Sequence, residues 1–452
     1  MKKIITYGSF DMLHFGHQRL LERAKALGDY LIVGVTSDDY DQIRGKINLQ
    51  QQVLQRVEAV RNLGLADEII IEEYDGQKID DILRYGIDIF AIGSDWKGKF
   101  DYLKQYCEVV YLDRTEGISS SGLRSAKRHV LIGFVGGGGM ACKLLNECRF
   151  VNGLVPGPVL SDDSRFIQEV HSHGGKRCDT FEEVLGYSDA VYIATHPSLH
   201  YAHIEKALLL GKHVICEAPL ALNVDECKRL YELADDRNLI LFEAIKTAYS
   251  TAFHRLILLA KMGKIGKVVS VDATCSSLAD LQGISANSLS EKWGTFDAWG
   301  PTALLPVFEL LGEKYITCDI DVAYLDREQT FDGFVKASFA FSDAVATVKI
   351  GKAVKSEGTL IISGTEGYIY VPAPWWKTDY FEIRRERQEE TRRYFYQLEG
   401  EGIRQMLVSF LKSIESGHNA SRIHRNFSFA VAKCGTFLRK RENVHVLSSI
   451  RR

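Results

Sequence analysis

Two histidines three positions apart give this sequence its clearest chemical signal. His14 and His17 flank the dipeptide Phe15-Gly16, and a strand-like run, residues 4–7, comes shortly before them. The residues that follow, 20–27, have the pattern of an amphipathic helix. Both imidazoles therefore fall in a strand-to-helix turn, where backbone N–H groups and the helix dipole favour anions. Such a turn can hold a nucleoside triphosphate while its α-phosphate is attacked.

The residue types in this turn suit transfer at phosphorus, which needs charge stabilisation more than covalent chemistry. Two imidazoles on one turn can both donate hydrogen bonds to the oxygens of a pentavalent phosphorus. Gly16 leaves room for the triphosphate to approach the backbone. The alternative interpretation is a turn with two ordinary polar histidines, and the complete pattern over residues 8–17 disfavours it.

The elements that position this turn alternate between strand and helix over residues 1–127. Ser119-Ser120-Ser121 could cap a last helix through Lys127. The pattern predicts a small doubly wound α/β domain with a parallel sheet. Its strands are expected at residues 4–6, 30–35, 68–71, 87–92 and 109–112.

A second strand-to-helix start follows at once. Residues 130–135 read as a strand, and Gly136-x-Gly138-x-x-Ala141 fits the dinucleotide fingerprint after it. Further strands at 190–194, 213–216 and 239–243 predict a second Rossmann-like domain over residues 128–250. The remainder, 251–452, should form an α+β domain with an antiparallel sheet. Its strands are expected at 268–277, 317–324, 333–341, 344–351 and 358–363.

Composition restricts the class of protein. The 452 residues are 46% hydrophobic and 25% charged, with a net charge of −3, so nothing favours nucleic acid or an acidic membrane as a partner. Nine cysteines without a CxxC pair predict reduced thiols in a cytoplasmic protein and no structural zinc. We expect neither a signal peptide nor a membrane span.

Three segments of the first domain resemble a known family. Residues 8–17, the run Gly93-Ser94-Asp95-Trp96 and the run Arg114-Thr115-Glu116-Gly117-Ile118-Ser119 look like those of the glycerol-3-phosphate cytidylyltransferases. These enzymes belong to the HxGH nucleotidyltransferase superfamily. The resemblance covers residues 1–126 almost without gaps.

The resemblance implies roles for individual residues. The catalytic residues would be His14, His17, Lys46 and Arg114, and the acceptor phosphate would be bound by Arg44 and Lys78. Arg56 matches a family arginine. Asp11 and Asp95 would order the site near Mg²⁺, which enters with the nucleotide and needs no protein cage. CTP would contact Ser9, Phe10, Asp11, Gly16, Lys46, Arg114, Thr115, Glu116, Gly117, Ile118, Ser119 and Ser120.

The reaction implied by the resemblance joins CTP to an alditol phosphate, with glycerol 3-phosphate as the expected acceptor. The products would be a CDP-alditol such as CDP-glycerol, and pyrophosphate. The acceptor phosphate is already anionic at neutral pH, so no general base is required. The family's role also implies a pathway, the synthesis of teichoic-acid-like or capsule polymers.

The rest of the chain, about residues 130–450, resembles the Gfo/Idh/MocA family of NAD(P)-dependent oxidoreductases. The resemblance rests on the glycine turn, on residues 194–200 and on residues 211–219, and it implies an NAD(P) site. The cofactor-binding residues would be Gly136, Gly138, Ala141, Thr195, His200 and Glu217.

The chemistry of that family is incomplete here. Its Glu-Lys-Pro motif reads Glu217-Ala218-Pro219, and Ala298 and Thr302 stand where an Asp and a His are expected. No acidic residue ends the second strand, where residues 154–158 stand instead. Lys246 is a candidate substitute for the missing lysine.

Three interpretations follow for the whole chain. The second half is either a reductase that makes the polyol phosphate from a keto-phosphate, or a scaffold or ligand-binding module without hydride chemistry. A wholly non-catalytic assembly protein is the third, which the intact first motif disfavours. Both families commonly form oligomers, so we expect a homo-oligomer, with the edge of the C-terminal sheet as a contact surface.

Overall fold

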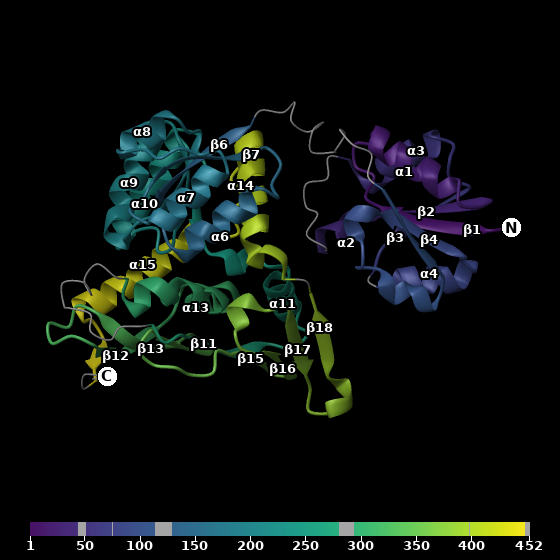
Figure 1. Ribbon diagram of the computed structural model, residues 1–452. Helices are drawn as coiled ribbons and strands as arrows, with labels where there is room; N and C mark the ends of the chain where they lie inside the picture. Colours follow the sequence, from purple (N-terminus) through teal and green to yellow (C-terminus); the bar gives the residue numbers. More distant parts are fainter. Residues whose placement is uncertain (44–50, 75, 114–128, 280–292, 397, 448–452) are drawn as a thin grey trace. The chain divides into compact units, whose positions relative to one another are not determined.

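A computed structural model describes residues 1–43, 51–74, 76–113, 129–279, 293–396 and 398–447. The chain divides into two compact units, Met1–Arg128 and His129–Arg452 (Figure 1). The expected Rossmann-like and antiparallel-sheet domains both lie in the second unit, and the division at residue 250 stays a prediction. Over the described residues, no helix is long and apolar enough to cross a bilayer.

The first unit is built on a five-stranded parallel sheet. Its strand order is β3-β2-β1-β4-β5, the arrangement of a doubly wound fold, so the predicted fold class is confirmed. Apolar side chains from both faces of the sheet form two cores, one with Leu21 and Val60 and one with Phe90 and Leu103. The strands are β1 (Lys3–Gly8), β2 (Tyr30–Thr36), β3 (Glu68–Glu72), β4 (Ile89–Gly93) and β5 (Glu108–Leu112).

The helices of the first unit alternate with these strands. They are α1 (Phe15–Lys25), α2 (Asp38–Ile43), α3 (Val53–Asn62) and α4 (Gln77–Tyr85), with short 3₁₀ helices η1 (Ser94–Trp96) and η2 (Asp101–Gln105). Helix α1 begins five residues earlier than its apolar pattern indicated. The reason is that His14 caps it, so the first turn contains His17 and few apolar residues.

The second unit begins with a second parallel sheet, in the order β10-β9-β8-β6-β7. Its strands are β6 (Val130–Gly136), β7 (Leu154–Leu160), β8 (Ala190–Ala194), β9 (His213–Glu217) and β10 (Leu241–Ala244). The helices are α6 (Gly139–Cys148), α7 (Ser164–Ser172), α8 (Phe181–Gly186), α9 (Pro197–Leu209) and α10 (Val224–Asp236).

One expectation about this sheet was wrong. Residues 154–158, expected where the second strand ends, lie inside β7, which continues to Leu160, and Ser161-Asp162-Asp163 follow it directly. An acidic pair therefore does stand after the second strand. The sequence concealed this because two prolines and a glycine inside β7 look like a loop. Pro156 and Pro158 are tolerated because β7 is the edge strand of the sheet.

The rest of the second unit folds over a nine-stranded mixed sheet. Its order is β18-β17-β16-β15-β11-β14-β13-β12-β19, antiparallel except for the pairs β11–β14 and β12–β19. The strands are β11 (Val268–Ser276), β12 (Thr317–Tyr324), β13 (Asp332–Ala340), β14 (Val345–Gly351), β15 (Leu360–Gly364), β16 (Gly367–Val371), β17 (Tyr380–Arg384), β18 (Arg392–Phe395) and β19 (Val444–Val446).

Helices join the two sheets of this unit. Figure 1 shows α11 and α13 over one face of the large sheet, while α14 packs on α6 and α15 packs on α10 and α13. The helical segments are α11 (Thr251–Lys261), α13 (Thr295–Leu311), α14 (Ile403–Ser416) and α15 (Arg425–Lys440), with η3 (Lys246–Tyr249), η4 (Trp375–Lys377), η5 (Gln388–Glu390) and η6 (Glu399–Gly402).

A buried arginine holds the first unit together near the histidine turn. The Arg56 side chain on α3 is 0% exposed and donates to the Ser9 carbonyl oxygen at 2.6 Å and to the Gln51 carbonyl oxygen at 3.1 Å. It also pairs with the carboxylates of Asp38, at 2.6 Å, and Asp41, at 3.3 Å. One cation thus links the end of β1, the start of α3 and helix α2.

We predict that Arg56→Ala destabilises the first unit by about 3–5 kcal/mol, because the substitution removes the cation from a buried ionic cluster. Hydrogen exchange of β1 and α3 amides measures the change in local unfolding free energy. Arg61→Ala, at an exposed position of the same helix, is the control and should change it by less than about 0.5 kcal/mol. Equal effects of the two substitutions would contradict the assigned role of Arg56.

Candidate functional site

The turn between β1 and α1 fixes the side-chain ring of the first predicted site residue. His14 is the N-cap of α1, and its Nδ1 atom accepts from the backbone N–H groups of Gly16, at 3.0 Å, and His17, at 3.4 Å. A nitrogen that accepts carries no proton, so the neutral ring has its proton on Nε2. The Nε2–H group is then the hydrogen-bond donor of this ring.

The two predicted histidines are brought together as a stacked pair. Their ring centroids lie 3.9 Å apart with an interplanar angle of 17°. The edge of the Phe10 ring packs against His17 at 5.5 Å between centroids. The pair is therefore held on one side by the helix cap and on the other by a buried aromatic ring.

The loop before His14 is strained, and polar contacts hold it. Phe10 and Met12 have φ values of 50° and 48°, in the left-handed region that costs a non-glycine residue free energy. The Asp11 carboxylate accepts from the Gln51 N–H at 3.1 Å, and the Met12 N–H donates to the Gln51 side chain at 2.9 Å. Such strain clusters at functional sites.

Gln51 was not singled out from the sequence. It stands just before α3, far along the chain from the histidines, and no local pattern marks it. The Arg56 guanidinium supports the same loop through the Ser9 carbonyl oxygen. The predicted residues Ser9, Phe10 and Asp11 are thus positioned by the start of a different helix.

Lys78, one of the two residues predicted to bind the acceptor phosphate, lies in the interior of the first unit. Its side chain is 8% exposed and forms an ion pair with Glu72, which is 1% exposed. The ammonium group also lies 4.7 Å from the Tyr7 ring centroid. Burial, followed by the hydrogen bond to Asp81, raises the pKa of Tyr7. In this structure Lys78 is held by protein groups, so binding an acceptor would require it to exchange partners.

Several predicted residues lie outside the described part of the chain: Arg44, Lys46, Arg114, Thr115, Glu116, Gly117, Ile118, Ser119 and Ser120, together with the helix expected before Lys127. Asp95 is described and lies in η1, directly after β4. Strands β1 and β4 are parallel neighbours, so Asp11 and Asp95 follow the same edge of the sheet. Within the described ranges, no three or more His, Cys, Asp or Glu side chains form a metal-binding group.

The glycine turn of the second unit has the geometry of a phosphate-binding turn. Gly136 has a φ of 90°, and a Cβ atom there would lie 2.3 Å from the Ala194 carbonyl oxygen. Gly138, with a φ of 96°, is the N-cap of α6, and a Cβ atom there would meet open space. Ala141 is 1% exposed and packs α6 on the sheet. The three positions match the requirements of a dinucleotide fingerprint.

The end of β7 faces this turn. A Cβ atom on Gly137 would lie 2.8 Å from the Ser161 hydroxyl oxygen and 3.1 Å from the Asp163 Cβ atom. Asp163 caps α7, and Asp162 is exposed beside it. Sequence reasoning missed these residues because it ended the strand too early. The N-cap pattern Asp163-Ser164 before an amphipathic helix was the available signal.

His200 connects two segments around the expected cofactor site. Its ring is 0% exposed, with Nδ1 2.8 Å from the Pro219 carbonyl oxygen and Nε2 2.8 Å from the Thr195 carbonyl oxygen. Burial lowers its pKa. Thr195 in turn contacts His203 Nδ1 at 3.1 Å through its hydroxyl. This geometry gives His200 a structural role between β8 and the loop after β9.

Glu217 and Lys246 are two groups of the second unit whose pKa values are shifted. The Tyr192 hydroxyl donates to the Glu217 carboxylate, and burial raises the pKa of Glu217 to about 7. Lys246, whose charge acts on Glu217, forms an ion pair with Glu401. The candidate substitute for the family lysine is therefore engaged with a carboxylate that no sequence motif indicated.

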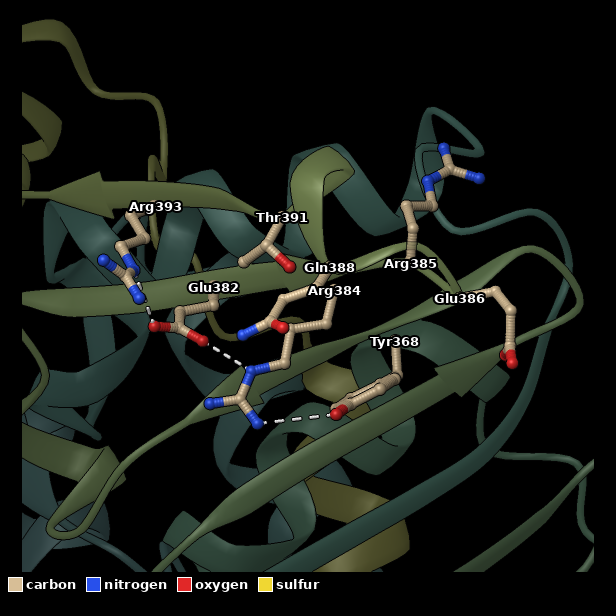
Figure 2. Close-up of a pocket in the computed structure, with 8 residues that line it drawn as sticks. All are labelled: Tyr368, Glu382, Arg384, Arg385, Glu386, Gln388, Thr391 and Arg393. Carbon is tan, nitrogen blue, oxygen red and sulfur yellow. Dashed lines mark hydrogen bonds and ion pairs between the residues drawn. The ribbon is translucent and has the colours of Figure 1, made fainter.

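A separate surface cavity of about 720 Å³ lies on the outer strands of the large sheet (Figure 2). Within it, the Glu382 carboxylate accepts from Arg384 and from Arg393. Two of its arginines are therefore paired with one carboxylate, and none of the predicted site residues lines the cavity. The lining residues are Tyr368, Glu382, Arg384, Arg385, Glu386, Gln388, Thr391 and Arg393.

Relatives of the first unit are close. Residues 5–126 match the cytidylyltransferase-like family. The glycerol-3-phosphate cytidylyltransferase of Bacillus spizizenii is 51% identical over 130 residues, which are 27% of this chain and 95% of the relative. Those of Bacillus subtilis and Staphylococcus aureus are 48% and 45% identical, over 95% and 93% of their lengths and 27% of this chain in each case.

Relatives of the second unit are more distant. Residues 130–245 match the oxidoreductase family with an NAD-binding Rossmann fold. The uncharacterized oxidoreductase YgjR of Escherichia coli is 44% identical over 81 residues, 18% of this chain and 25% of the relative. The fold matches KijD10, a 3-ketoreductase from Actinomadura kijaniata in complex with NADP and TDP-benzene, with a TM-score of 0.62, 17% identity, and coverage of 72% of this chain and 100% of that one.

The stacked histidines at a helix start and the match to nearly the full length of the first unit's relatives point to the same family. The chain belongs to the cytidylyltransferase-like family of nucleotidyltransferases through its first unit, and the same polypeptide carries an oxidoreductase-family domain with an NAD-binding Rossmann fold.

Proposed function

We propose that the first unit transfers the cytidylyl group of CTP to an alditol phosphate, with glycerol 3-phosphate as the acceptor. The observation that carries this proposal is the stacked His14–His17 pair at the start of α1, in which the His14 ring is fixed by its N-cap hydrogen bonds. The extent and identity of the match to three glycerol-3-phosphate cytidylyltransferases support the choice of substrates.

In the proposed step, an oxygen of the acceptor phosphate attacks the α-phosphorus of CTP. The bond from that phosphorus to the oxygen that bridges to the β-phosphate breaks, and pyrophosphate leaves with its electron pair. His14 and His17 stabilise the charge that develops on the α-phosphate oxygens. Arg114 and the backbone of residues 115–120 would hold the leaving phosphates. Asp11 is engaged by Gln51, so we propose that Mg²⁺ is bound mainly by the nucleotide and derive no step from a metal held by protein.

We propose that the second unit binds NAD(H) but does not transfer hydride efficiently. The open space at Gly138 and the close backbone approach at Gly136 fit a pyrophosphate at the start of α6. Ala218 replaces the family lysine, and Lys246 is paired with Glu401. The alternative is a reductase that makes the polyol phosphate from a keto-phosphate, with Lys246 as the proton donor. The lowered pKa that burial gives Lys246 favours this alternative.

The remaining partners and the location are also proposals. A homo-oligomer is proposed because both families commonly form one, and sedimentation analysis of the full chain tests it. A cytoplasmic location is supported by the nine cysteines, all of which are free thiols. The products would feed the synthesis of a glycerol-phosphate polymer such as teichoic acid or capsule.

Replacement of either histidine should lower kcat by about 100-fold, the cost of one lost transition-state donor. His14→Asn and His17→Ala are the informative variants, because asparagine retains an N-cap acceptor and so preserves the start of α1. Pyrophosphate release from CTP and glycerol 3-phosphate measures the rate. His171→Ala, at an exposed position of α7, is the control. If the wild-type chain turns over no phosphorylated polyol, the proposed reaction is wrong.

The wild-type chain should bind NADH about tenfold more tightly than NADPH, because a carboxylate after the second strand accepts from a ribose hydroxyl and repels a 2′-phosphate. Asp162 is the candidate, since Asp163 is occupied as the cap of α7. Fluorescence titration with both cofactors measures the ratio. Asp162→Asn should reduce the preference for NADH over NADPH, whereas Asp179→Asn on a nearby loop should leave this preference unchanged. A wild-type preference for NADPH would contradict this assignment.

Incubation with NADH and either dihydroxyacetone phosphate or ribulose 5-phosphate should give cofactor binding without loss of nicotinamide absorbance. The physical reason is the missing lysine at position 218. The variant Ala218→Lys restores the family motif and tests whether the missing lysine is the cause. Steady oxidation of NADH by the wild-type chain would establish the reductase alternative instead.

A further inference from the structure

Three lysines of the second unit converge on one carboxylate. Lys143 Nζ lies 3.0 and 2.9 Å from the two Glu401 carboxylate oxygens, Lys377 Nζ lies 3.3 Å from one of them, and Lys246 Nζ makes the shortest contact. We call these four residues the Glu401 cluster. Within these four residues, three cations against one anion leave a surplus of two positive charges, and the Glu217 carboxylate also interacts with the Lys246 charge.

The cluster is partly buried, and its four side chains differ in their exposed fractions. The side chain of Lys246 is 13% exposed and that of Glu401 is 23% exposed, while Lys377 and Lys143 are 36% and 42% exposed. Burial lowers the pKa of Lys246. Burial also opposes ionisation of Glu401, but hydrogen bonds from Lys246 and Lys143 outweigh it and lower the pKa to about 2. The lysines therefore hold an ionised carboxylate at a site that solvent reaches from one side.

The backbone that carries Glu401 is strained. Gly400, Glu401 and Gly402 have φ values of 69°, 50° and 89°, so a non-glycine residue occupies the left-handed region between two glycines. A Cβ atom on Gly402 would lie 2.1 Å from the Lys246 carbonyl oxygen. The segment is thus packed directly on the loop that carries Lys246. Strain of this kind persists where the surroundings impose it, and it clusters at ligand sites.

The cluster draws on both halves of the second unit. Lys143 is in α6, within two turns of the glycine turn, and Lys246 follows β10. Lys377 comes from η4 of the large-sheet half, where the Thr247 hydroxyl donates to the Trp376 carbonyl oxygen at 3.2 Å. The glycine turn lies at the carboxyl edge of the parallel sheet, and strands β9 and β10 end at the same edge. Ligands bind at this edge in open α/β folds.

We propose that the Glu401 cluster binds the phosphate group of a small ligand other than the dinucleotide, and that Glu401 is the internal counter-ion that occupies the site in the absence of this ligand. A phosphate dianion together with one carboxylate balances the charge of three ammonium groups. Lysine binds phosphate as a point charge and needs no fixed bidentate geometry, so the lysines can exchange the Glu401 oxygens for phosphate oxygens. The inference holds whether the unit reduces the ligand or only binds it.

Calorimetric titration of the full chain with inorganic phosphate and with dihydroxyacetone phosphate tests the proposal. Lys246→Met and Lys377→Met should each weaken binding by about tenfold or more, as expected for a lost charged hydrogen bond. Glu401→Gln keeps the side-chain shape but removes the competing charge, so it should strengthen binding several-fold. Lys412→Met, at an exposed position of α14, should leave binding unchanged. Tighter binding of dihydroxyacetone phosphate than of phosphate would identify a phosphorylated substrate as the source, and equal binding would identify free phosphate.

The opposite signs expected for the lysine and glutamate variants separate a binding role from a structural one. A merely structural cluster would lose affinity, or show no change, in all three variants, and that result would overturn the proposal. A parallel titration with NADH should be unaffected by Lys246→Met; a matching loss would assign the cluster to the cofactor's own phosphates and also overturn it. Neither readout needs CTP turnover or hydride transfer, so these results stay distinct from a failure of the proposed function.

Discussion

The hydrogen bonds that the His14 ring accepts from the first turn of α1 are the interaction on which the proposed transferase site depends. These hydrogen bonds cap the start of α1, and they fix which nitrogen of the neutral ring carries the proton. Stacking then places His17 parallel to a ring whose orientation is already set. In the proposed reaction, two imidazoles positioned by one helix start would need little reorganisation when charge develops on a bound phosphate.

The buried Arg56 guanidinium stabilises the loop that leads into that turn. It binds the carbonyl oxygens of Ser9 and Gln51 and the carboxylates of Asp38 and Asp41, so the loop before His14, the start of α3 and helix α2 share one cation. A buried charge is tolerated when each of its donors has a partner. The strained residues Phe10 and Met12 are held within this frame, which explains how the loop keeps φ values that side chains normally avoid.

The second unit distributes its charges differently. Glu217 accepts from a tyrosine hydroxyl, and Lys246 pairs with Glu401, which two further lysines also contact. A family lysine at position 218 would have been the obvious proton donor, and its replacement by alanine leaves the remaining cations grouped around a carboxylate. In one chain, a phosphate-transfer site and a cation cluster for a phosphorylated ligand would act on related compounds.

The sequence by itself determined the parts that depend on local pattern. Apolar runs and turn residues predicted both parallel sheets and most of the large sheet, and the spacing of His14 and His17 predicted that they share a turn. It misjudged the end of β7, because prolines on an edge strand look like a loop. Only the tertiary structure decided the partners of Lys78, Lys246, Gln51 and Arg56. Those contacts join residues that are distant in sequence, and a lysine that pairs with a buried glutamate has the same local pattern as one that faces solvent.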